Sequence, residues 1–202
     1  MTERRIAPHV RTATSVPVLM RRVLYALTPA LLAYVWFFGF GVVFNILVAV
    51  LAAVATEAAC LRLQNRPLAP FLGDYSAVVA AVLLALALPP LTPWWITSIG
   101  CVFAIGVAKH AYGGVGNNPF NPAMAGYVVL LVSFPDQLAN WLPPRMGDID
   151  YESIGFFANL GFTLTGSLPA GLNLDALTRA TPLDLMQTEL SNRRMVGEIR
   201  DQ

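Results

Sequence analysis

VLYALTPALLAYVWFFGFGVVFNILVAVLAAVATEAACL, residues 23–61, is an almost unbroken apolar run that decides the fold. One helix needs only about 20 residues to cross a bilayer, so the run is too long for a single span. Glycine disfavours a continuous helix, and the only closely spaced glycines of the run are Gly39 and Gly41. The run therefore predicts two transmembrane helices that fold back on each other near Gly39-Phe40-Gly41.

Three shorter apolar stretches follow. The first covers about residues 75–88 and ends at Pro89-Pro90, the second runs from Trp94-Trp95 to Lys109-His110, and the third covers about residues 123–134. Stretches this short favour half-helices or broken helices that neighbouring helices shield from lipid. We therefore predict an all-α polytopic membrane protein with about five transmembrane or broken helices.

The composition supports a membrane protein. Hydrophobic residues make up 56% of the 202 residues and charged residues 12%, against about 25% in soluble domains. Residues 23–134 contain few charged side chains, namely Glu57, Arg62, Arg66, Asp74 and Lys109. We divide the chain into an N-terminal segment (1–22), the helices (23–134) and a tail (135–202). The first residues lack a following apolar run and a cleavage site, so no removable signal peptide is expected.

The distribution of basic residues predicts the orientation. Arginines precede the first helix at positions 4, 5, 11, 21 and 22, two more follow the second helix, and Lys109 ends the fourth. By the positive-inside rule, these alternate ends lie on the cytoplasmic side. Five spans then place the tail, with nine acidic residues and five arginines, in the periplasm.

The cysteines and histidines do not form a recognisable metal site. Cys60 and Cys101 are far apart in sequence and lie within or beside expected helices, so we interpret both as apolar packing residues. Nothing resembles a zinc or iron–sulfur arrangement. His9 and His110 lie at or beyond helix ends, which is a poor position for a haem ligand. We predict no metal and no haem.

A glycine- and asparagine-rich loop, GGVGNNPFNP, covers residues 113–122. It lacks the full pattern of a nucleotide-binding loop and follows no strand. The Asn-Pro steps favour extended backbone, and Pro122 suits the first turn of a helix. The free N–H groups of that helix suit a polar ligand, which makes Asn118 and Asn121 candidates for an ion or flavin pathway. Alternatively, the loop is a tight turn whose asparagines cap the helix.

The tail contains DALTRATPL at residues 175–183. Taken alone, Asp175 suits a helix cap, Thr178 and Thr181 suit surface hydroxyls, and the following proline suits a turn. A threonine hydroxyl is a poor nucleophile at neutral pH, so any covalent modification at Thr181 calls for either a nearby base or a separate transferase, of which we favour the transferase. Arg179 could pair with a phosphodiester formed there.

Together the two segments resemble a known family. Residues 113–127 match Gly-Gly-x-Gly-x-Asn-x-Phe-Asn-Pro-Ala-Met-x-Gly-Tyr, and residues 175–181 match Asp-x-x-(Ser/Thr)-x-Ala-Thr. These motifs resemble the D-type membrane component of the Rnf electron-transport complex (RnfD) and, less closely, the B-type component of the sodium-pumping NADH:quinone reductase (NqrB). The family motif often has glycine where this chain has Arg179, which we interpret as the Rnf-like version.

The resemblance implies a function. It implies FMN joined through its phosphate to Thr181, with Asp175 and Thr178 orienting the acceptor, and a second, non-covalent flavin, riboflavin. It implies an electron-carrying subunit of a redox-driven ion-translocating complex in the bacterial inner membrane, rather than an independent enzyme. The implied partners are the A, B, C, E and G type subunits and a flavin transferase, and no nucleic acid. The family fold has about ten helices in two related halves, of which this chain resembles the first.

Glu57 is the one acidic residue expected well inside a helix. An ionisable group there is a functional candidate, and one hypothesis is that it helps carry Na⁺ or H⁺. The alternative is that Glu57 lies near the cytoplasmic end and reaches Arg62 or the lipid headgroups.

Two other classes of function remain open on the sequence alone. Asn121-Pro-Ala at a helix start is similar to the pore half-helix of water channels, although a second Asn-Pro-Ala is absent from the sequence. The chain could also be a purely structural subunit that anchors redox partners. Both alternatives predict a colourless protein, whereas the flavoprotein hypothesis predicts a flavin that survives denaturation.

Overall fold

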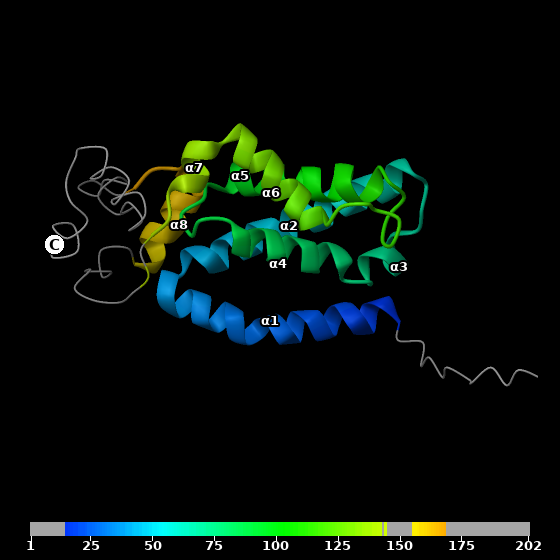
Figure 1. Cartoon of the computed structure of the whole chain (residues 1–202), viewed down its shortest axis with the longest axis horizontal. Helices are drawn as coiled ribbons and strands as arrows, with labels where there is room; N and C mark the ends of the chain where they lie inside the picture. Colours follow the sequence, from blue (N-terminus) through cyan, green and yellow to red (C-terminus); the bar gives the residue numbers. More distant parts are fainter. Residues whose placement is uncertain (1–14, 143, 145–154, 169–202) are drawn as a thin grey trace, which may run out of the picture.

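The structure, a computed structural model, describes residues 15–142, 144 and 155–168. All the elements in this part of the chain are helices (Figure 1). In chain order they are α1 (Val16–Phe38), α2 (Gly41–Leu63), α3 (Leu68–Leu72), α4 (Ser76–Ala87), α5 (Trp94–Val102), η1 (Phe103–His110), α6 (Pro122–Ser133), α7 (Pro135–Ala139) and α8 (Phe156–Thr165). The predicted all-α fold class is confirmed for these residues.

The break in the long apolar run lies where the sequence predicts it. α1 ends at Phe38, Gly39 adopts a φ of 82°, and α2 begins at Gly41. A φ in this region strains any residue with a side chain, so glycine at position 39 fits the turn. The start of α1 differs from the expected residue 23, because Pro17 occupies its first turn and extended Ser15 precedes it.

Two of the helices in the described ranges are long and apolar enough to cross a membrane. They are α1 and α2, each with 23 residues. α4 and α6 have 12 residues each, in agreement with the prediction that the later helices are short or broken. α5 continues directly into the π-helix η1, so the expected stretch from Trp94 to His110 is helical throughout. The number of complete spans stays a prediction.

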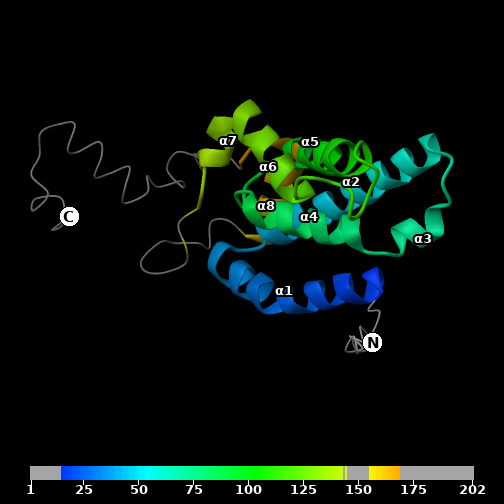
Figure 2. The ribbon, with the colours of Figure 1, turned by 45° about the vertical axis from the view of Figure 1, so that its right-hand side comes forward.

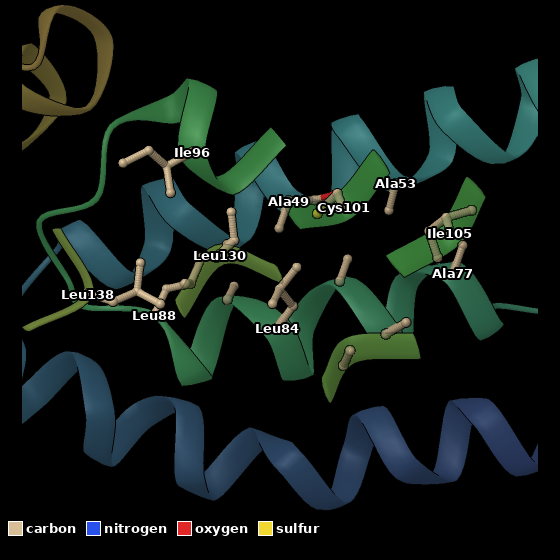
Figure 3. Packing of buried hydrophobic residues seen from close by; sticks show 14 residues of the cluster. Ala49, Ala53, Ala77, Leu84, Leu88, Ile96, Cys101, Ile105, Leu130 and Leu138 are labelled. Carbon is tan, nitrogen blue, oxygen red and sulfur yellow. The ribbon is translucent and has the colours of Figure 1, made fainter. Parts of the chain in front are cut away.

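The core is built largely from small residues. Ala49, Ala53 and Ala77 meet Leu84 and Ile105 in one buried cluster, in which the helices approach closely (Figure 3). Small side chains permit such approach, which is the usual basis of helix packing in membranes. α1 lies alongside this bundle as a separate layer in both views and contributes no fully buried residue (Figures 1 and 2).

Two helices of the segment that the sequence analysis assigns to the tail pack on the bundle. These helices are α7 and α8, and α8 packs against α2. The Phe156 ring lies 5.5 Å from that of Phe40 and 5.1 Å from that of Phe44, measured between centroids. Phe162 joins a second buried cluster with Leu91. With 10 residues α8 is too short for a full span.

The start of α1 and the ends of α2 and η1 lie around one pocket. This pocket is lined by residues from the first turn of α1, from the segment after α2, from α3 and from the end of η1. At the opposite end of α2, Asn45 Nδ2 donates hydrogen bonds to the carbonyl oxygens of Pro89 (2.8 Å) and Pro90 (3.3 Å). The alternate ends therefore share one side of the bundle. Which side of the membrane this is stays a prediction.

Candidate functional site

A buried ion pair joins α2 to η1. Lys109 Nζ lies 2.6 Å from Glu57 Oε1 and 2.7 Å from Glu57 Oε2. The two side chains are 4% and 1% exposed. Such burial removes both charges from water at a large desolvation cost, which close pairing and further hydrogen bonds offset.

A third oxygen completes the surroundings of the ammonium. Lys109 Nζ also donates to Ser76 Oγ at 2.7 Å. Asp74 Oδ1 accepts from the Ser76 hydroxyl at 2.5 Å and from the Ser76 backbone N–H at 2.7 Å, which fixes the serine at the start of α4. Tyr75, between them, has a φ of 62°, a left-handed conformation that costs energy for a non-glycine residue. The local structure thus holds Ser76 in place for Lys109.

The π-helix brings a second basic residue to the same carboxylate. His110 Nε2 lies 3.5 Å from Glu57 Oε1, and His110 Nδ1 lies 3.4 Å from Gln64 Nε2. Short π-helical segments occur often at functional sites. Here the segment of eight residues ends with Lys109 and His110, both of which reach Glu57. The sequence carried no signal for this geometry.

The structure corrects the alternative interpretation of Glu57. Its partner is Lys109 rather than Arg62 or the lipid headgroups. Lys109, which the sequence suggests as a charge at a helix end, is buried as well. The hypothesis that Glu57 is a functional intramembrane acid remains, and the structure adds a partner for it.

Two pockets meet at Lys109. One, of about 370 Å³, is lined by Ser76, Lys109 and the loop residues Asn118, Phe120 and Asn121. The other, of about 380 Å³, is lined by Glu57, Arg66, Lys109, His110 and the Gly113–Gly114 turn. Lys109 is common to both, whereas Glu57 lines only the second and Ser76 only the first. The ion pair therefore lies between two pockets of the size that small ligands use.

The loop before α6 acts first as a cap. Asn121 Oδ1 accepts a hydrogen bond from the Ala123 backbone N–H at 3.0 Å, and Pro122 occupies the first turn. Asn118 Nδ2 donates to the Phe120 carbonyl oxygen at 2.7 Å, which closes the turn. The capping interpretation is thus confirmed for Asn121. Both asparagines also line the first pocket, so a ligand role stays open.

The cap leads to a prediction about stability. Replacing Asn121 with Ala is expected to lower the free energy of unfolding by about 1 kcal/mol, because an α6 N–H loses its acceptor. Asn121→Ser should retain most of the stability, since serine also caps. Thermal unfolding of the purified protein in detergent measures both. Equal losses for both variants would contradict a capping role.

The cysteines differ in their surroundings. Cys101 is fully buried in the main cluster, and its Sγ lies 3.4 Å from the Ala49 carbonyl oxygen. Cys60 is partly buried. The packing role is confirmed for Cys101.

The residues of the attachment motif, Asp175, Thr178, Arg179 and Thr181, lie outside the described residues. The flavin linkage at Thr181 stays a prediction.

A helical bundle in which two helices are long and apolar enough to cross a membrane indicates a membrane protein. The sequence profile of the NQR2, RnfD, RnfE family matches residues 4–201, so the chain belongs to this family. Among curated relatives, it is 47% identical over 198 residues to a protein from Aeromonas salmonicida (strain A449). This alignment covers 96% of the chain and 57% of the relative.

Two further relatives match over 200 residues. The chain is 44% identical to a protein from Aliivibrio salmonicida (strain LFI1238) and 42% identical to one from Escherichia fergusonii. Each alignment covers 96% of this chain and 56% of the relative. All three relatives are named as the D-type subunit of an ion-translocating oxidoreductase complex. The chain thus spans just over half the length of these relatives.

Proposed function

We propose that this chain is part of a membrane subunit that carries electrons on an FMN linked by a phosphoester to Thr181, within a redox-driven ion-translocating complex. The observation that carries the proposal is the Asp175–Thr181 motif, in a chain that belongs to the NQR2, RnfD, RnfE family and follows the family's order of motifs. The relatives' names supply the complex and the ion translocation.

The chemistry at Thr181 belongs to a transferase. The hydroxyl is the acceptor, Asp175 and Thr178 orient it, and Arg179 neutralises the phosphodiester charge that the linkage leaves behind. When bound, the flavin supplies the one- or two-electron chemistry, and the chain supplies attachment, reach and electrostatic tuning.

The test of this proposal is the covalent flavin itself. The full-length protein, co-expressed with a flavin transferase, is expected to show flavin fluorescence on a denaturing gel. Thr181→Ala should abolish the signal completely, because no hydroxyl remains at the acceptor position. Thr178→Ala, which removes a neighbouring hydroxyl of the same kind, should keep measurable fluorescence.

Absence of fluorescence from the wild type, with the transferase active on a control protein, would refute the flavin carrier and favour the channel or the structural subunit. Fluorescence that persists in Thr181→Ala would place the linkage elsewhere. Equal loss in the variants at 178 and 181 would show that the whole segment is needed for recognition.

The first pocket is a reasonable place for the second, non-covalent flavin. Its volume of about 370 Å³, the Phe120 ring and the amides of Asn118 and Asn121 fit a planar heteroaromatic ring with polar edges. These residues would hold the ring by stacking and hydrogen bonding.

The proposed setting is the bacterial inner membrane, with the segment around Thr181 on the periplasmic side and Glu57 on the pathway of Na⁺ or H⁺. The A, B, C, E and G type subunits are the proposed partners. The charge distribution of the chain supports this orientation.

A further inference from the structure

We propose that Glu57 and Ser76 form a binding site for a monovalent cation, and that the Lys109 ammonium is its tethered occupant. A free cation enters only when the lysine leaves. The site stands on the described residues alone, and only its use in transport rests on the proposed function.

The geometry around Lys109 Nζ is that of a cation among oxygen ligands. Three oxygens lie within hydrogen-bond distance, two from Glu57 at 2.6 and 2.7 Å and one from Ser76 at 2.7 Å. Carboxylate and hydroxyl oxygens are also the ligands that small hard cations prefer. Glu57, the carboxylate in direct contact with the ammonium, carries one negative charge, and Asp74 adds a second carboxylate behind Ser76.

Ser76 is held in place independently of Lys109, because Asp74 fixes it through two hydrogen bonds. Glu57 is buried on α2, where His110 Nε2 lies 3.5 Å from its carboxylate. Without the ammonium, the Glu57 carboxylate would be left in a protein interior where an unpaired charge is very costly. A small cation that reaches the carboxylate would therefore be bound.

A route for the cation is present on both sides. Lys109 lines both pockets, with Glu57 facing the second pocket and Ser76 the first. The lysine side chain therefore borders both pockets, as does Val115. Withdrawal of the lysine would vacate the oxygens that hold it.

The test replaces the tethered cation with a free one. Lys109→Ala, purified as the full-length protein in detergent, is expected to melt below the wild type. Na⁺, K⁺ or NH₄⁺ should raise its melting temperature in a saturable manner, by about 5 °C or more at a hundred times the dissociation constant. Tetramethylammonium at equal ionic strength is too large and should have no such effect.

Three controls separate the site from general salt effects. The wild type should show no saturable response, because Lys109 already fills the site. Arg66→Ala should not respond either, because it removes a positive charge from the second pocket without vacating the oxygens. Lys109→Ala combined with Glu57→Gln should fold without responding, because the charge that binds the cation is gone.

Folded Lys109→Ala that ignores small cations would overturn the proposal. The proposal would also be overturned if Lys109→Ala failed to fold in every one of these salts while the double variant folded. A free cation in the site would neutralise Glu57 and allow Lys109→Ala to fold. The flavin gel measures neither outcome. A failed cation site and a failed flavin carrier are thus distinguishable.

Discussion

Lys109→Met is expected to lower the free energy of unfolding by about 3–5 kcal/mol, because it leaves the Glu57 carboxylate buried without its ion partner. Methionine has a similar length but no charge, so packing changes little. The His110 ring remains near the carboxylate without replacing the ammonium. Equilibrium unfolding in mixed micelles, followed by tryptophan fluorescence, measures the loss.

The matched control removes both charges. Lys109→Met combined with Glu57→Gln should recover most of the stability, because neutral residues of similar volume avoid the cost of an unpaired buried charge. The difference between the single and double variants gives the coupling energy. A double variant as unstable as Lys109→Met alone would show that packing around the lysine, rather than its charge, decides stability.

Gly41→Ala is expected to have the second largest effect, a loss of about 1–3 kcal/mol in the free energy of unfolding. A β-carbon at this position would overlap the Pro90 carbonyl oxygen and lie 3.0 Å from Asn159 Oδ1. The carbonyl cannot retreat freely, because it belongs to the turn that Asn45 holds by hydrogen bonds. The start of α2 or the turn before α5 must therefore move.

Gly161→Ala is the control for this substitution. Gly161 also lies in a helix, α8, but among the described residues a β-carbon added there would meet no atom within 4 Å apart from the nearby backbone of α8. Alanine there should leave stability unchanged or raise it by up to about 1 kcal/mol, through its better helix propensity. Thermal unfolding of both variants measures the two effects. Equal losses of stability would mean that the close approach at Gly41 does not cause the loss in Gly41→Ala.

The helix boundaries were predictable where a local signal marks them. Gly39 breaks the long run, Pro89-Pro90 stops α4, and Asn121-Pro122 starts α6, each through the backbone properties of the residues themselves. α8 was missed although its residues are apolar, because ten residues are too few for a span and they lie within a charged tail.

The ion pair could not be predicted in the same way. Glu57 was recognisable as a buried acid, but its partner is 52 residues away in sequence. Periodicity describes one helix at a time and says nothing about which helices meet. The π-helix is a further reason, because it changes the direction in which Lys109 and His110 project, and no residue pattern in the stretch announces it.

The separation of the pair has a consequence for the order of synthesis. Glu57 leaves the ribosome 52 residues before Lys109, which corresponds to about 3–10 s at the usual rate of elongation. During that interval α2 is present without its counter-charge. The attraction between the two residues is gained only when η1 has been synthesised. It therefore brings the earlier helix α2 and the later helix η1 together, and favours the closed bundle over an isolated α2 in lipid.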